Sequence, residues 1–104
     1  MARFQLTEAQ REQVEAISRK YFVRELSLFG SSVTGGFDAE RSDLDFAVVF
    51  NRPIGIGPAD QYFGLLEDLR QLFGRNVDLV SERAVRNRYF REELNETKVR
   101  LYAA

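Results

Sequence analysis

The strongest strand signal in the chain is Leu44-Asp45-Phe46-Ala47-Val48-Val49-Phe50, which Ser42-Asp43 introduces. Side chains alternate between the two faces of a strand. The apolar set that begins with Leu44 therefore points one way, and Asp43 and Asp45 are neighbours on the other face. Two ionised carboxylates about 5 Å apart repel by roughly 3 kcal/mol at an effective dielectric constant near 20. This pair needs a compensating partner.

A third aspartate interrupts the next short apolar segment, a strand predicted over Asn76 to Val80 that contains Val77-Asp78-Leu79-Val80. An ionised Asp among core-type residues is costly unless it is paired or bound to a metal. The chain has no His and no Cys. Three carboxylates without nitrogen or sulfur ligands indicate an oxygen-ligand site for Mg²⁺ or Mn²⁺.

Each of these aspartates also has a purely structural interpretation. Asp43 could end a loop, Asp78 could cap a turn, and Asp45 could pair with Arg41 or Arg75. The spacing D-x-D is common, so by itself it does not distinguish a metal site from these roles.

Leu28-Phe29-Gly30-Ser31 leads from a predicted strand, Val23 to Phe29, into a turn. Such a turn can place backbone N–H groups and a hydroxyl around a phosphate, and Gly30 allows close approach. The alternative is a tight turn in which Ser31 only caps a helix of one or two turns within Ser31 to Arg41.

Three longer helical patterns accompany the strands. The first covers about residues 8 to 21, after the capping-box pair Thr7 and Gln10. The second follows the break Asn51 to Pro58 and ends near Gly74, and its apolar stripe is expected to pack into the core; the stripe is Tyr62, Leu65, Leu66, Leu69 and Leu72.

The third helix is predicted from about Arg83 to Glu96, with Ser81 as its N-cap, and Lys98 to Tyr102 is ambiguous between a helix end and an edge strand. The order of elements predicts an α/β (α+β) fold with a small mixed sheet flanked by helices. The length of 104 residues predicts one domain over 1–104.

Composition limits the possible chemistry and partners. Without Cys or His the chain cannot use a thiol nucleophile or an imidazole base. The net charge of −1 argues against direct nucleic-acid binding held by bulk charge. The absence of a signal-like or bilayer-length apolar run predicts a cytoplasmic protein without a membrane partner.

The combination of Gly30-Ser31, eleven intervening residues, Asp43-x-Asp45 and a later strand Asp78 resembles the nucleotidyltransferase superfamily related to DNA polymerase beta. The chain is most similar to its smallest branch, the minimal nucleotidyltransferases, from about Leu26 to Tyr102. The resemblance implies a nucleotidyltransferase palm. In that branch the protein is commonly an antitoxin that transfers AMP from ATP to hydroxyls of a HEPN-domain RNase toxin.

The resemblance also implies a role for each matching residue. Gly30 and Ser31 would hold the triphosphate, Asp43 and Asp45 would bind the metal ions, and Asp78 would complete the metal site and help deprotonate the attacking hydroxyl. Nucleotidyl transfer is an in-line displacement that two metal ions held by carboxylates can promote. The expected cofactor is therefore Mg²⁺ or Mn²⁺, with ATP as substrate and the toxin as acceptor.

One departure from the branch follows the Gly-Ser pair. Basic residues are frequent there, whereas this chain has Ser32-Val33-Thr34-Gly35, which removes possible phosphate contacts. That difference favours a second hypothesis, an antitoxin that binds and occludes its toxin without catalysis. Transfer to RNA or to a small molecule ranks lower, because the chain is not basic and has no room for a substrate domain.

The C-terminal part is locally basic, with six cations against three acids between Arg83 and Arg100. This pattern is typical either of a solvated helix face or of a surface for an acidic partner or nucleotide phosphates. The candidate residues are Arg83, Arg86, Arg88 and Arg91.

Overall fold

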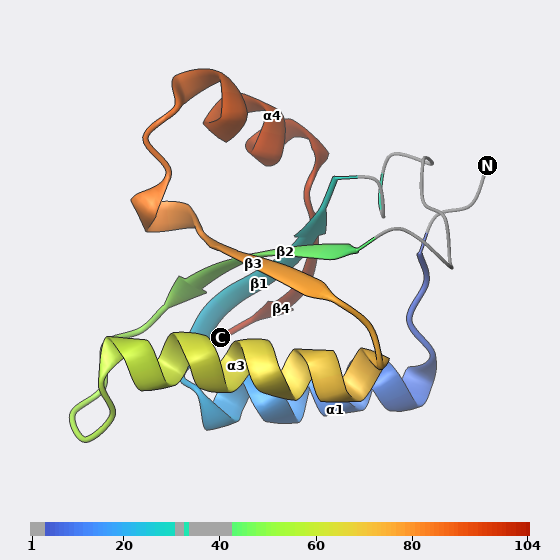
Figure 1. The fold of residues 1–104 in the computed structure, drawn as a ribbon, viewed down its shortest axis with the longest axis vertical. Helices are drawn as coiled ribbons and strands as arrows, with labels where there is room; N and C mark the ends of the chain where they lie inside the picture. Colours follow the sequence, from blue (N-terminus) through green and yellow to red (C-terminus); the bar gives the residue numbers. More distant parts are fainter. Residues whose placement is uncertain (1–3, 31–32, 34–42) are drawn as a thin grey trace.

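The computed structural model describes residues 4–30, 33 and 43–104, and a four-stranded sheet forms its centre (Figure 1). The strands lie in the order β3-β2-β1-β4. Strand β1 is antiparallel to β2 and β4, and β2 is parallel to β3, which confirms the predicted mixed sheet. Their bounds are β1 (Val23–Phe29), β2 (Leu44–Phe50), β3 (Val77–Ser81) and β4 (Val99–Ala103).

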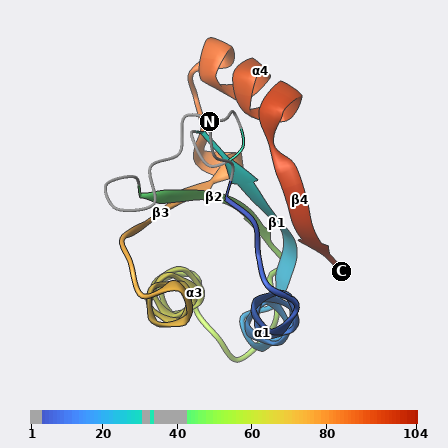
Figure 2. The same cartoon turned by 90° about the vertical axis from the view of Figure 1, so that its right-hand side faces the viewer.

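Two helices, α1 (Glu8–Lys20) and α3 (Pro58–Phe73), cover one side of the sheet, and α4 (Arg88–Thr97) lies on the other side (Figures 1 and 2). The predicted capping box begins α1. The Gln10 backbone N–H donates to Thr7 Oγ1 at 3.1 Å, and the Thr7 backbone N–H donates to the side-chain oxygen Oε1 of Gln10 at 2.9 Å. Gly74 ends α3 in the left-handed conformation that favours glycine.

The core lies between the sheet and the pair α1 and α3. Leu44, Phe46 and Val48 of β2 are fully buried, as their alternation predicts. Leu65 and Leu69 of the α3 stripe are also fully buried, and the other stripe members pack against this core. The odd-numbered side chains of β2, among them Asp45, are consequently directed to the opposite face.

The predicted continuous helix from Arg83 to Glu96 is wrong. The chain instead forms a short 3₁₀ turn, η1 (Glu82–Ala84), passes through Val85 in an extended conformation, and begins α4 at Arg88. Val85 is buried, and the Arg83 guanidinium donates to the Phe50 carbonyl at 3.0 Å. Tertiary contacts therefore hold this segment extended. The N-cap is Asn87, whose side chain accepts from the Phe90 N–H, rather than Ser81, which ends β3.

The ambiguous C-terminal segment is a strand. Pairing with the open edge of β1 decides this, because Leu26 stands opposite Tyr102 and Leu28 opposite Val99. A Lys98–Glu82 ion pair of 2.9 Å, with both side chains largely buried, connects the start of β4 to η1.

Gln61 is a buried polar residue of α3, only 1% exposed, and its amide Nε2 donates to the carbonyls of Tyr21 at 3.0 Å and Asn51 at 2.9 Å. We expect Gln61→Leu to destabilise the fold by about 2–3 kcal/mol, because two carbonyls lose their donor. Urea unfolding would measure this loss. The exposed change Gln71→Leu on the same helix is the control, and an equal effect of both changes would contradict the bridging role.

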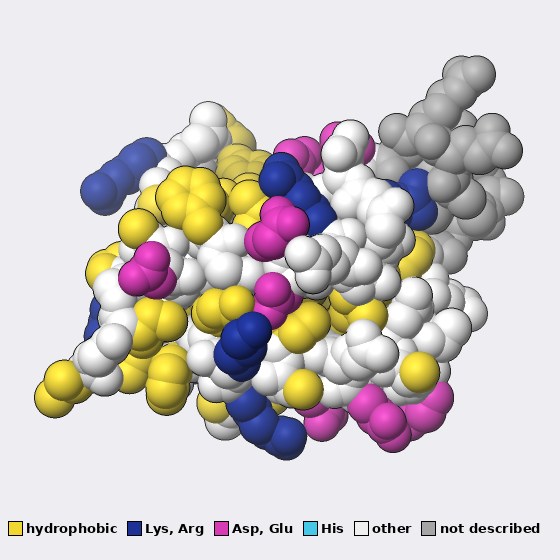
Figure 3. Space-filling model, turned by 60° about the horizontal axis from the view of Figure 1, so that its bottom comes forward, with side chains coloured by type: hydrophobic (Ala, Val, Ile, Leu, Met, Phe, Trp, Pro, Cys, Tyr) yellow, Lys and Arg dark blue, Asp and Glu magenta, His cyan; other side chains and the backbone are white. Residues whose placement is uncertain are grey.

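The side on which α1 and α3 lie carries interspersed acidic and basic side chains (Figure 3). Lys20 pairs with Asp68 across the two helices at 3.2 Å. Of the helices in the described ranges, none is long and apolar enough to cross a membrane.

Candidate active site

Three neighbouring strands bring the predicted site residues together. Phe29 at the end of β1 is the register partner of Asp45 in β2, and Asp45 is the register partner of Asp78 in β3. Gly30 follows Phe29 directly. The order across the sheet is therefore Gly30, Asp45, Asp78, although 48 positions separate the first and last in sequence.

Gly30 lies against the Asp45 carboxylate. A Cβ atom built on Gly30 would lie 2.5 Å from Asp45 Oδ2, and its φ of +72° is one that residues with side chains rarely adopt. Glycine is needed at this turn both for its conformation and for the space beside the carboxylate. The other residue of the predicted phosphate turn, Ser31, lies outside the described residues, as does the predicted short helix that follows it.

The electrostatics of the site are dominated by carboxyl groups. Burial, followed by the charge and the hydrogen bond of Asp78 and then by the charge of Asp43, raises the pKa of Asp45 to about 6. A hydrogen bond between two carboxyl groups requires one of them to carry a proton. Asp45 and Asp78 therefore form a pair in which full ionisation is costly.

The structure does not bring all three aspartates into one cluster. Asp43 is exposed and acts on Asp45 through its charge. Among the described residues, no group of three acidic side chains is close enough to hold a metal ion. The convergent pair is Asp45 and Asp78, and Asp43 precedes it on the same face of β2.

This pair suits a hard divalent cation. Mg²⁺ is commonly bound through one or two carboxylates together with phosphate oxygens and water. A half-buried carboxyl whose ionisation is opposed by burial and by a second carboxyl gains most from a cation. The donor set of Asp45 and Asp78 contains oxygen only, so it fits Mg²⁺ or Mn²⁺.

A cavity of about 460 Å³ adjoins the carboxylates. Besides Phe29, Asp45 and Asp78 it is lined by residues of β3 and by one edge of α3, namely Tyr62, Leu66 and Arg70. The Tyr62 hydroxyl donates to the Leu79 carbonyl at 2.5 Å and fixes α3 against β3.

The sequence did not predict that Arg70 lines the cavity. Tyr62 and Leu66 are predicted as part of a core stripe, and both do pack against the core. Their spacing contained a signal nonetheless, because Tyr62, Leu66 and Arg70 recur every four residues and so follow one edge of the helix.

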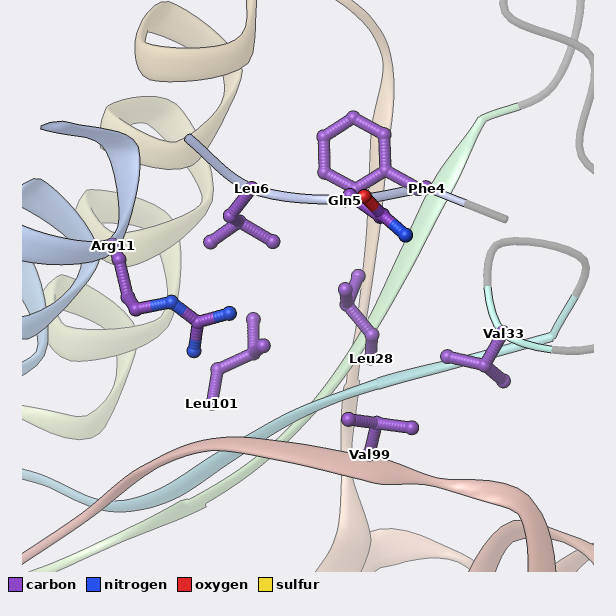
Figure 4. Close-up of a pocket in the computed structure, with 8 residues that line it drawn as sticks. All are labelled: Phe4, Gln5, Leu6, Arg11, Leu28, Val33, Val99 and Leu101. Carbon is purple, nitrogen blue, oxygen red and sulfur yellow. The ribbon is translucent and has the colours of Figure 1, made fainter. Parts of the chain in front are cut away.

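A second cavity, of about 350 Å³, lies on the side of the sheet that α1 covers (Figure 4). Its walls are mostly apolar, formed by residues such as Leu6, Leu28 and Leu101, and the Arg11 guanidinium reaches into it. Of the aspartates in the described ranges, none lines this second cavity, whereas Asp45 and Asp78 line the first.

Comparison with known proteins identifies the scaffold. The family model described as "Nucleotidyltransferase domain" matches residues 10–101. The chain belongs to this nucleotidyltransferase family. Two proteins of Methanocaldococcus jannaschii, each named "Putative protein adenylyltransferase", are similar to this nucleotidyltransferase. One is 29% identical over 92 residues, 88% of this chain and 90% of the relative, and the other is 33% identical over 87 residues, 83% and 84% of the two chains.

Solved structures share the fold of this nucleotidyltransferase. One described as "Structure of putative minimal nucleotidyltransferase" is 31% identical, with a TM-score of 0.71 and 88% of each chain covered. A Shewanella oneidensis complex described as a tri-AMPylated HEPN toxin with its MNT antitoxin has a TM-score of 0.64 at 18% identity, covering 95% of this chain and 74% of the other. These likenesses confirm the predicted family, a minimal nucleotidyltransferase, and its α+β fold.

Several arginines of the basic C-terminal segment make hydrogen bonds or ion pairs within the fold. Arg83 donates to the Phe50 carbonyl, Arg91 to the Val85 carbonyl, and Arg88 pairs with Glu92 at 3.3 Å. Arg86 is exposed. The T-shaped contact of Phe29 with Phe90, 5.8 Å between ring centroids, holds α4 near the site end of β1.

Proposed function

We propose that this nucleotidyltransferase transfers AMP from ATP to a hydroxyl of a partner protein, and that the partner is a HEPN-domain toxin. The observation that carries the proposal is the convergence of Gly30, Asp45 and Asp78 from three adjacent strands beside one cavity. Paired carboxylates beside a glycine turn suit a reaction in which a metal-bound triphosphate is attacked by a hydroxyl.

The residues have distinct roles in this proposal. Gly30 and Ser31 hold the triphosphate, Asp45 and Asp78 hold Mg²⁺ or Mn²⁺, and the charge of Asp43 adds to the attraction for the cation. The metal, when bound, neutralises charge on the phosphates and on the departing pyrophosphate. Asp78 helps to remove the proton of the acceptor hydroxyl, whose oxygen bonds to the α-phosphorus as the bond to pyrophosphate breaks. No histidine is available for that proton transfer, so a carboxylate is the natural base.

The identity of the partner rests on the relatives. Two of them are named for protein adenylylation, and one structural neighbour is described as an AMPylated HEPN toxin in complex with an MNT antitoxin. We place the reaction in the cytoplasm, where ATP and such a toxin are both available.

A second candidate function is neutralisation of the toxin by binding alone. Its support is the stretch Ser32-Val33-Thr34-Gly35, which lacks the basic residues frequent after the Gly-Ser pair in this branch. The intact Asp45 and Asp78 pair opposes it, because a scaffold that only binds gains nothing from two adjacent carboxyls whose repulsion costs stability.

Mass spectrometry separates the two candidates. The purified chain is incubated with a HEPN-domain protein of the same organism, ATP and Mg²⁺. We expect the HEPN protein to gain about 329 Da for each AMP transferred, which is the mass of one adenylyl group less the displaced proton. Asp78→Asn should suppress the gain while complex formation, measured by size exclusion, is kept. Equal neutralisation of toxin activity by both proteins without any mass gain would favour occlusion.

A further inference from the structure

The side from which the acceptor approaches follows from the order of residues across the sheet, provided that the proposed function holds. Gly30 lies on the β1 side of Asp45, and Asp78 lies on its β3 side. If the triphosphate occupies the glycine turn, its departing pyrophosphate lies toward β1. In an in-line displacement the attacking oxygen is opposite the leaving group. The acceptor hydroxyl therefore arrives from the side of β3.

A cavity opens on the β3 side of the carboxylates. The cavity of about 460 Å³ extends from Asp45 and Asp78 to Tyr62, Leu66 and Arg70 of α3. Strand β3 is an edge of the described sheet, so no further described strand covers this approach. The cavity is large enough for one side chain and the backbone that carries it.

Arg70 is the one cation among the described residues that line this cavity. It is exposed, and within the described part of the chain its guanidinium makes no hydrogen bond or ion pair, although its backbone carbonyl accepts from the Gly74 N–H at 2.8 Å. The guanidinium of Arg83, by contrast, donates to the Phe50 carbonyl at the other end of β2. A guanidinium without a partner beside a cavity is suited to the forked recognition of a carboxylate.

We propose that Arg70 is a specificity-determining residue that pairs with a carboxylate of the acceptor protein, beside the hydroxyl that is modified. The apolar walls, Phe29 and Leu66, accommodate the side chain carrying the hydroxyl, and Arg70 fixes the neighbouring acidic residue. A phosphate of ATP is the competing occupant. Among the described residues, the cavity that Arg70 lines includes Asp78 and does not include Gly30, and this favours the acceptor.

The test compares Arg70→Gln, Arg70→Glu and Arg70→Lys in transfer to the HEPN protein, followed by mass gain. We expect Arg70→Gln to lower kcat/KM for the HEPN protein about tenfold through KM, Arg70→Glu to lower it further, and Arg70→Lys to retain most of it. Arg52→Gln, an exposed cation after the far end of β2, is the matched control and should leave transfer unchanged. Binding of a fluorescent ATP analogue should be the same in all four variants.

A charge exchange identifies the acidic residue. The modified hydroxyl is located by peptide mapping, and each Asp or Glu near it is replaced by Lys in turn. One of these replacements should restore transfer by the Arg70→Glu variant while weakening transfer by the unchanged chain.

Three results would overturn the inference while leaving the proposed function intact. They are unchanged kinetics of Arg70→Glu, loss of ATP-analogue binding in Arg70→Gln, and failure of every charge exchange. Absence of any mass gain with the unchanged chain would instead contradict the proposed function itself. The two failures are therefore distinguishable.

Discussion

Replacing Gly30 by alanine is expected to reduce AMP transfer about a hundredfold while the fold survives. The new Cβ would lie 2.5 Å from Asp45 Oδ2, so the carboxylate must turn away. This atom is the end of a side chain and not backbone, so the fold can yield by moving the carboxylate. A displacement of about 1 Å at a reacting centre can cost about 10²-fold in rate. Initial rates of mass gain in the HEPN protein measure the loss.

The chain contains a matched control for this substitution. Gly74 has a similar φ, +62°, but nothing lies within 4 Å of the position its Cβ would take. Both alanine variants incur the left-handed backbone strain, about 1–2 kcal/mol, which urea unfolding should reveal as similar losses of stability. Only Gly30→Ala should lose transfer. Equal activities in the two variants would exclude Gly30 from the site.

Replacing Asp45 by asparagine is expected to abolish transfer and, at the same time, to stabilise the fold. The proposed function assigns the metal to Asp45 and Asp78, so loss of the Asp45 carboxylate should lower the rate by about 10³-fold, equivalent to about 4 kcal/mol of transition-state stabilisation. At neutral pH the fold should gain about 1 kcal/mol, after allowance for the solvent screening of this half-exposed carboxyl, because an ionised group is removed from beside Asp78. Transfer rates and urea unfolding measure the two effects.

The stabilisation should depend on pH in a defined direction. The pKa of Asp45 is raised from 3.8 to about 6 on folding, so between these values the folded chain binds more protons than the unfolded chain. The contribution of this group to stability therefore falls as pH rises through that window and is constant above it. The advantage of Asp45→Asn should be small at pH 4 and complete by about pH 7.

Asp60→Asn is the control for this effect. Asp60 is an exposed acid in the first turn of α3, where a negative charge interacts favourably with the helix dipole. Its replacement should cost a few tenths of a kcal/mol at neutral pH, the opposite sign. Stabilisation by both changes would indicate a general effect of net charge, and an Asp45→Asn advantage that shrinks as pH rises would contradict the proposed environment of Asp45.

Elements whose signals are local could be predicted from the amino-acid sequence. The capping pair Thr7 and Gln10 predicts the start of α1, and the alternation in Leu44–Phe50 predicts β2 and the face that carries Asp45. These features depend on neighbours within a few positions, whose geometry is set by the period of the helix or strand. The spacing of Gly30 and the aspartates likewise indicates the family.

Elements that depend on partners distant in the sequence were set by long-range packing and strand pairing. The segment after β3 has helical periodicity, but burial of Val85 and the contact of Arg83 with Phe50 keep it extended until Asn87 caps α4. Lys98 to Tyr102 is a strand because the edge of β1 is available to pair with it. Propensity is a weak prior, and such long-range contacts override it.

The candidate site also combines features that the sequence predicts with features that depend on long-range contacts. The types of residue that it uses could be predicted, since the absence of His and Cys leaves carboxylates to hold a metal. Register alone placed Asp45 beside Asp78 and left Asp43 outside the convergent pair. The packing of α3 against β3 brought Arg70 to the same cavity. Residue chemistry is a property of the sequence, whereas these distances arise only when strands far apart in the chain pair and a helix packs across their edge.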